Sequence, residues 1–126
     1  MRYSLASLLV LLFLALSVNT VAAAETQAVQ TMAGVLLKLN HFPSDGDKEA
    51  LQGILGNEGT TEQERVVAQA LMNLEHKVSP DDKPRLDALL KDESASEGVK
   101  TLAGVLLGLA HTPTAADKEK LQKLVP

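Results

Sequence analysis

Three histidines, His41, His76 and His111, are the residues of this 126-residue chain whose type and spacing could support chemistry. They are the only histidines in the sequence, and 35 residues separate each one from the next. An imidazole ring can bind a metal ion, transfer a proton or end a helix with a hydrogen bond, because it titrates near neutrality and has two distinct nitrogens.

The same polar residue types follow each histidine at fixed distances. A serine or threonine comes three residues later, an aspartate six residues later and a lysine seven residues later. These residues are Ser44, Ser79 and Thr114; Asp47, Asp82 and Asp117; and Lys48, Lys83 and Lys118. Imidazole and carboxylate together ligate zinc and other divalent metals. The three histidines and three aspartates are therefore candidate metal ligands.

A structural role explains the same pattern. Each histidine is expected at the C-terminal end of one helix, and each aspartate at the start of the next, where both types suit the helix ends. A His–Asp hydrogen bond would then clamp the corner between the two helices. Stacked repeats would form a ladder with neighbouring helices about 8–10 Å apart. We therefore favour the corner clamp, with a metal site and a polar surface for a partner as alternatives.

Composition excludes several other kinds of chemistry. The chain has no cysteine, which removes disulfides, thiolate metal sites and cysteine nucleophiles. A net charge of −4, no basic block and only three aromatic residues argue against nucleic-acid binding. No phosphate loop, dinucleotide-binding motif, nucleophile elbow or zinc-protease motif is present. We therefore predict no catalytic residue, no enzyme activity and no cofactor.

The 35-residue spacing belongs to an internal repeat. Residues 30–55 and 100–125 are identical at 14 of 26 positions. Residues 65–90 match the first copy at nine positions, five of them Ala or Leu and four of them the histidine, serine, aspartate and lysine described above. The repeat divides the chain into units 26–60, 61–95 and 96–126. A single unit cannot bury its own apolar face, and about three units make stacking self-sufficient.

Each unit has the pattern of two helices. In the first helix, apolar residues recur at i, i+3, i+4, i+7 and i+8, as in residues 29–37. The second helix is shorter and has apolar residues at i, i+3 and i+4, as in residues 51–55. The sequence therefore predicts an all-α fold of three tandem helical hairpins, arranged as a short α-solenoid or a compact helical bundle.

The ends of these helices carry capping signals. The serine or threonine three residues before each repeated aspartate predicts the N-cap of a second helix, and Pro80 suits the first helical position of the middle one. Thr61 with Glu64, and Ser94 with Glu97, have the spacing of a capping box. Two prolines are expected to end the preceding first helices: Pro43 and Pro113.

Residues 1–24 have the three parts of a secretory signal peptide. These are a positive Arg2, an apolar run at 8–16 and three alanines at 22–24. The run is shorter than the roughly 20 residues of a membrane span, so a retained anchor is the less favoured alternative. We expect cleavage after residue 24, export to the periplasm or extracellular space, and a single mature domain of residues 25–126 with no stable membrane span.

These observations predict an exported small helical-repeat protein that acts as a binding or scaffold module for a protein or peptide partner. The alternative is a metal-binding or metal-buffering envelope protein that uses the repeated histidine and aspartate positions. The repeat fixes neither the partner nor the metal.

Overall fold

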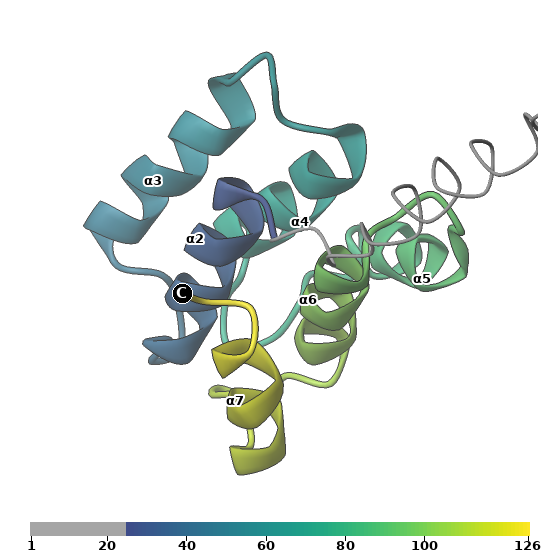
Figure 1. The fold of residues 1–126 in the computed structure, drawn as a ribbon. Coiled ribbons are helices and arrows are strands. Elements are labelled where there is room, and N and C mark those ends of the chain that lie inside the picture. Colours follow the sequence, from purple (N-terminus) through teal and green to yellow (C-terminus); the bar gives the residue numbers. More distant parts are fainter. Residues whose placement is uncertain (1–24) are drawn as a thin grey trace, which may run out of the picture.

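The computed structural model describes residues 25–126, which form six α-helices and no β-strand (Figure 1). The helices are α2 (Gln27–Leu37), α3 (Asp45–Gly56), α4 (Glu62–Met72), α5 (Lys83–Lys91), α6 (Glu97–Leu107) and α7 (Ala115–Gln122). They confirm the predicted all-α fold of three tandem hairpins. The predicted signal peptide, residues 1–24, lies outside the described residues. Within the described part of the chain, no helix is long and apolar enough to cross a lipid bilayer.

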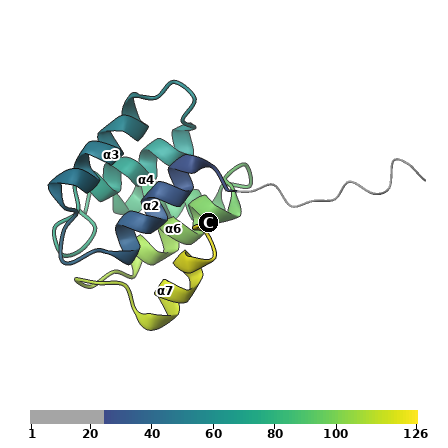
Figure 2. The same cartoon turned by 60° about the vertical axis from the view of Figure 1, so that its left-hand side comes forward.

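The three hairpins close into a ring. Helix α3 packs against α4, α5 against α6, and α7 against α2, so the second helix of each unit lies on the first helix of the next. The first helices, α2, α4 and α6, contact one another at the centre. Figure 2 shows these three helices together, with α3 and α7 on opposite sides of them. The fold is therefore the compact bundle, because an open solenoid keeps its first and last units apart.

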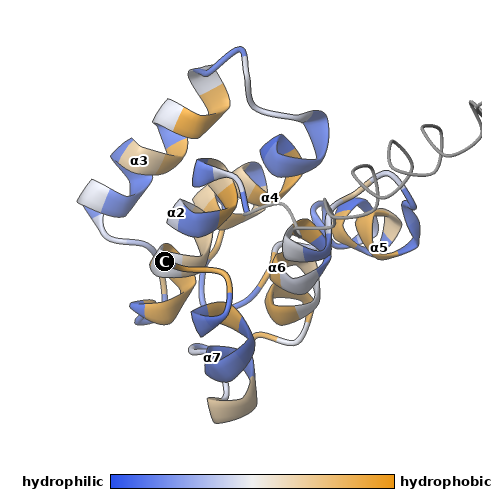
Figure 3. Cartoon of the chain, in the orientation of Figure 1, coloured by the Kyte–Doolittle hydropathy of each residue, from blue (hydrophilic) through white to orange (hydrophobic). Residues whose placement is uncertain are grey.

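Aliphatic side chains at equivalent repeat positions fill the interior of this ring. Those fully buried in the first helices include Val29, Leu36, Val67, Leu71, Leu102 and Leu106. Each second helix adds one fully buried leucine at the same repeat position: Leu51, Leu86 and Leu121. Figure 3 shows the hydrophobic residues on the inner sides of the helices and the hydrophilic residues on the outer sides. Every unit thus contributes to one shared core, and this burial is the main driving force for folding.

The predicted caps of the first and third hairpins are confirmed. Ser44 Oγ accepts the backbone N–H of Asp47 at 3.1 Å, at the start of α3. Thr114 and Asp117 form a complete capping box at the start of α7. In each case the cap satisfies amide groups that have no partner inside the helix.

The capping box predicted at Ser94 and Glu97 is wrong. Ser96 is the N-cap of α6, and its hydroxyl accepts the N–H of Val99 at 3.1 Å. Ser94 instead donates its hydroxyl to Asp92 Oδ1 at 2.6 Å in the preceding turn. The turn therefore uses Ser94 before the helix begins, and the next serine takes the capping position.

The start of the middle second helix is also later than predicted. Helix α5 begins at Lys83 with Asp82 as its N-cap, so Pro80 lies before the helix. Pro84 explains the difference because it has no N–H, and a helix that began at Pro80 would need that group to bond the carbonyl of residue 80. Ser79 and Asp82 instead form a turn in which Ser79 Oγ donates to Asp82 Oδ2 at 2.8 Å.

Prolines do not end the first helices, contrary to the prediction. Helix α2 ends at Leu37 and α6 at Leu107, six residues before Pro43 and Pro113. These prolines and Val78 share one repeat position, and all three are buried under the corner of their hairpin. Both helices end before the proline because the chain reverses direction between the helix and the proline, at His41 and at His111.

Candidate metal centre

Each of the three histidines adopts a left-handed backbone conformation at the corner of its hairpin. The φ angles are 73° at His41, 66° at His76 and 71° at His111, and no other residue in 25–126 has a positive φ. For a residue with a Cβ atom, this conformation costs roughly 1–2 kcal/mol, and glycine or asparagine usually occupies such positions. Histidine is among the non-glycine residue types enriched in this conformation, and here it occupies all three corners.

A closed ring of backbone hydrogen bonds holds the corners together. The N–H of His76 donates to the C=O of His41 at 2.9 Å, and the N–H of His111 donates to the C=O of His76 at 2.7 Å. The N–H of His41 donates to the C=O of His111 at 3.2 Å and completes the cycle. Each unit thus contributes one donor and one acceptor, and the three corners meet at the pseudo-threefold axis of the bundle.

The three imidazole rings converge on one point. The Nδ1 atom of His41 lies 3.1 Å from that of His76 and 3.2 Å from that of His111, and the remaining pair is 3.2 Å apart. The ring centroids are 5.0–5.2 Å apart, and the planes cross at 69–77° in an edge-to-face arrangement. All three side chains are exposed, so the point is open to solvent.

These three short contacts cannot all be hydrogen bonds. The Nδ1 of an imidazole carries either an N–H or a lone pair, so it cannot donate to one neighbour and accept from the other. With three nitrogens and two possible roles, at least one contact must place two lone pairs or two N–H groups against each other. A metal cation between the rings removes this conflict, because it accepts a lone pair from each of the three nitrogens.

The size of the nitrogen triangle fits a transition metal ion. A tetrahedral ion bound at 2.0–2.1 Å needs ligand atoms about 3.3–3.4 Å apart, because a tetrahedron edge is about 1.63 bond lengths. An octahedral ion at about 2.1 Å needs about 3.0 Å. The observed separations of 3.1–3.2 Å lie between these values. The histidines thus form one face of a coordination sphere whose other positions open toward solvent.

The surrounding backbone also favours a cation. Each histidine follows the last residue of α2, α4 or α6 by four residues, so the C-terminal ends of all three central helices lie beside the cluster. A helix C-terminus carries a partial negative charge of about half an elementary charge, which favours a nearby cation.

The repeated aspartates are not part of the cluster. Within residues 25–126, the group of side chains close enough to share a metal ion consists of the three histidines alone. Asp47 accepts from Lys38 Nζ at 3.1 Å, while Asp82 accepts from Asn73 at 3.0 Å and from Ser79. Each Nδ1 atom contacts the other two rings, and no hydrogen bond joins a histidine ring to an aspartate within residues 25–126, so the His–Asp corner clamp expected from the sequence is wrong.

The other repeated polar residues lie at the starts of the second helices. The hydroxyls of Ser44 and Thr114 cap α3 and α7, and Ser79 supports the turn before α5. The repeated lysines occupy the first turn of the same helices: Lys48, Lys83 and Lys118. Their role in the site is thus indirect, since they belong to the segment that follows each corner.

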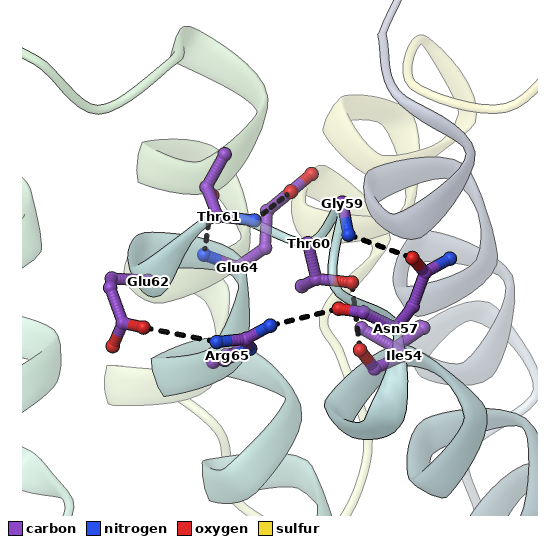
Figure 4. Close-up of polar contacts among 8 residues, drawn as sticks. All are labelled: Ile54, Asn57, Gly59, Thr60, Thr61, Glu62, Glu64 and Arg65. Carbon is purple, nitrogen blue, oxygen red and sulfur yellow. Dashed lines mark hydrogen bonds and ion pairs between the residues drawn. The ribbon is translucent and has the colours of Figure 1, made fainter.

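The burial of Glu64 at the opposite end of the central helices was not predicted from the sequence. Glu64 is 3% exposed, accepts the N–H of Thr61 at 2.9 Å, and also accepts the hydroxyl of Thr26 from the first unit. Thr61 caps α4 in return, which confirms the predicted capping box (Figure 4). The N-caps Thr26, Thr61 and Ser96 line one small cavity of about 110 Å³. The carboxylate therefore sits where three positive helix ends meet.

The loop before Glu64 is held by a separate network (Figure 4). Arg65 donates to the Glu62 carboxylate at 3.1 Å and to the carbonyl of Asn57 at 2.8 Å. The Thr60 hydroxyl donates to the carbonyl of Ile54 at 2.7 Å. These bonds tie the end of α3 to the start of α4 and fix the direction in which Glu64 enters the interior.

No protein-family model matches the chain, and no curated protein and no solved structure matches it. The candidate site therefore depends on the geometry of the three histidines themselves.

Proposed function

We propose that this protein binds one divalent transition metal ion through the Nδ1 atoms of His41, His76 and His111. The observation that supports the proposal is the convergence of three imidazole nitrogens within 3.2 Å of one another. Each nitrogen comes from a different repeat unit and from a strained backbone position. Strain at equivalent sites is typical of residues kept for function. Of the two functions expected from the sequence, this geometry favours the metal-binding one over the partner-binding module.

The donor set favours particular metals. Three neutral imidazoles suit zinc, copper, nickel and cobalt, whereas magnesium and calcium prefer oxygen ligands. Affinity should follow the usual order for nitrogen sites, with Cu²⁺ tighter than Ni²⁺ or Zn²⁺.

The exposure of the site favours a metal that exchanges. Structural zinc sites have four protein ligands and are closed, while this cluster provides three and is exposed. Ligating histidines usually donate their second N–H to a protein acceptor, which strengthens the site. No such bond from Nε2 is present among residues 25–126. With export as expected from residues 1–24, we propose metal buffering or transfer outside the cytoplasm.

Calorimetric titration of residues 25–126 with Cu²⁺, Ni²⁺, Zn²⁺ and Mg²⁺ tests the proposal. These residues contain all six described helices and the shared core that they form. We expect one ion per chain, a Kd of about 10 µM or tighter for the transition metals, and no binding of Mg²⁺. A ligand at 100 times its Kd should stabilise the fold by about 2.7 kcal/mol, which raises Tm.

The matched control is His76→Asn. Asparagine adopts the left-handed conformation readily, so the variant should keep the corner while it loses one ligand. Its zinc affinity should fall at least about tenfold. If wild-type protein binds no transition metal tighter than tens of micromolar, or if His76→Asn binds as well as wild type, the three-histidine site is wrong.

A further inference from the structure

A groove next to the histidine cluster shares one wall with it. It lies between the first hairpin corner and the end of α4, has a volume of about 560 Å³, and is lined by residues that include Phe42, Met72, Lys48 and Glu75. His76 lines the same groove, so a molecule in it lies beside a metal ligand. The volume is in the range of small-molecule sites in proteins.

The groove breaks the symmetry of the three repeats. Phe42 occupies a position where the other units have Lys77 and Thr112. It is 56% exposed and is one of only two large apolar residues in 25–126 that are exposed, the other being Leu90. Together with the half-buried Met72, it provides an apolar wall at one corner only. An exposed aromatic ring of this kind gains free energy when a ligand covers it.

The charges around the groove favour an anionic ligand when a metal ion is bound. Three neutral imidazoles leave the positive charge of a bound divalent ion uncompensated, and Lys48 adds a further positive group. Glu75 contributes a single negative group to the same lining. Positive charge is therefore in excess only when the metal is bound, and an anionic donor can then complete the coordination of the ion.

We infer that the metal-loaded protein binds a small organic carboxylate with an apolar body. The carboxylate occupies an open coordination position of the ion, and the apolar body lies along Phe42 and Met72. This inference rests on the proposed metal site, and it assigns a ligand class to that site. It also explains why the apolar wall is found beside His76 and not at the other two corners.

Phenylacetate and acetate provide a direct test, because they share the carboxylate and differ by the phenyl group. In NMR titrations of the zinc-loaded chain, phenylacetate should bind about five- to tenfold more tightly than acetate. Without zinc, neither should bind. Phenylacetamide, which keeps the ring and lacks the carboxylate, should not bind the zinc-loaded chain.

The matched variant is Phe42→Thr, which introduces the residue that the third unit has at this position. It should bind zinc as wild type does, while the preference for phenylacetate over acetate falls to about twofold or less. Glu75→Gln removes the negative group of the groove and should tighten phenylacetate binding about two- to threefold.

The outcomes separate the two proposals. If the chain binds no zinc, the metal site and the ligand class are both wrong. If zinc binds but wild type does not distinguish phenylacetate from acetate, or binds phenylacetamide equally well, the ligand class alone is overturned. A peptide with a free C-terminal phenylalanine that binds at least tenfold more tightly than phenylacetate would assign the groove to peptide ends, and would also overturn the small-molecule inference.

Discussion

The two ends of the central helices α2, α4 and α6 differ in how their charge is complemented. At the N-terminal end, the Glu64 carboxylate is buried among the caps and bonds Thr26 and Thr61. At the C-terminal end, three histidines converge, and Lys38, the C-cap of α2, pairs instead with Asp47 at 3.1 Å. The protein supplies the anion for the positive end itself, whereas the negative end has three groups suited to hold a cation from solution.

This difference separates an end that is satisfied internally from the end where we propose that a metal binds. Glu64 occupies a repeat position where the other units have Val29 and Val99, and it bonds polar groups of the first and second units. The histidine position is the same in every unit, as the proposed metal site requires, since each unit would supply one ligand. The repeated aspartates and lysines also occur in every unit but stay apart from the axis, so repetition alone does not place a residue there, and the left-handed corners of the histidines do.

The largest expected effect is at the buried end. Glu64→Ala removes the partner of the Thr26 hydroxyl and the Thr61 amide, and should lower the free energy of unfolding by about 1–3 kcal/mol. Urea denaturation followed by circular dichroism measures this loss. Zinc affinity should remain within about twofold of wild type, since the histidines lie at the other end. Unchanged stability would show that Glu64 does not hold the N-terminal ends together.

Substituting two glycines of α6 tests how closely α6 and α2 approach at the N-terminal end. A Cβ atom on Gly98 would lie 2.8 Å from Cγ1 of the fully buried Val29, and closer still to Glu25. Gly98→Ala should therefore destabilise the protein by about 1–2 kcal/mol.

Gly104→Ala is the matched control in the same helix. A Cβ atom on Gly104 meets nothing within 4 Å, so this variant should be more stable by about 0.5–1 kcal/mol. Thermal melts of both variants measure the difference. Equal effects with the same sign would mean that helix propensity alone, and not the contact with Val29, decides the outcome.

At the histidine end, replacing a side chain is expected to raise the stability of the protein. Glycine has no Cβ penalty in the left-handed conformation, so His76→Gly should raise the stability of the metal-free chain by roughly 0.5–1 kcal/mol. The same variant should lose zinc affinity at least about tenfold. Urea denaturation in the presence of a chelator, followed by zinc titration, measures both effects. A loss of metal-free stability would instead assign the ring of His76 a structural role.

The sequence predicted the helices of the fold but not how the three hairpins close into a ring. Periodicity located all six helices, and spacing identified the caps Ser44, Thr61 and Thr114. It did not show that α7 returns to α2, because that contact depends on the angle between successive hairpins, which no local pattern encodes. The histidines were therefore expected along a ladder. Their left-handed backbone was missed too, since a positive φ is uncommon for any residue other than glycine and no glycine marks these corners.

Two sequence signals could have corrected this expectation. One is the charge of Glu64 on an otherwise apolar helix face, because a carboxylate there must find polar partners inside the fold. The other is the single histidine in each of three equal units. Three equal units can close into a ring, and one residue per unit then meets its copies on the axis.

The smallest expected effect concerns the ion pair beside the first corner. Burial raises the pKa of the Asp47 carboxyl, but hydrogen bonds from Lys38 and Ser44 and the charge of Lys38 lower it by more, so the pKa lies below its ordinary value. A carboxyl whose pKa is lower in the folded state stabilises the fold above its unfolded pKa of about 3.9, and this contribution is lost as the pH falls through the folded value. Asp47→Asn should therefore lower stability at pH 7, and the loss should shrink as the pH falls through the folded pKa.

The size of that loss should be below about 1 kcal/mol, because Lys38 is largely exposed and the pair is screened by solvent. Urea denaturation of Asp47→Asn and wild type at pH 7 and near pH 2, with and without 1 M NaCl, measures it. Salt should shrink the difference at pH 7, since it screens exposed charges. A difference of the same size at both pH values would mean that Asp47 acts through packing and not through charge. Zinc affinity within about twofold of wild type would show that the negative end of the helices depends on the histidines and the bound ion, and not on this pair.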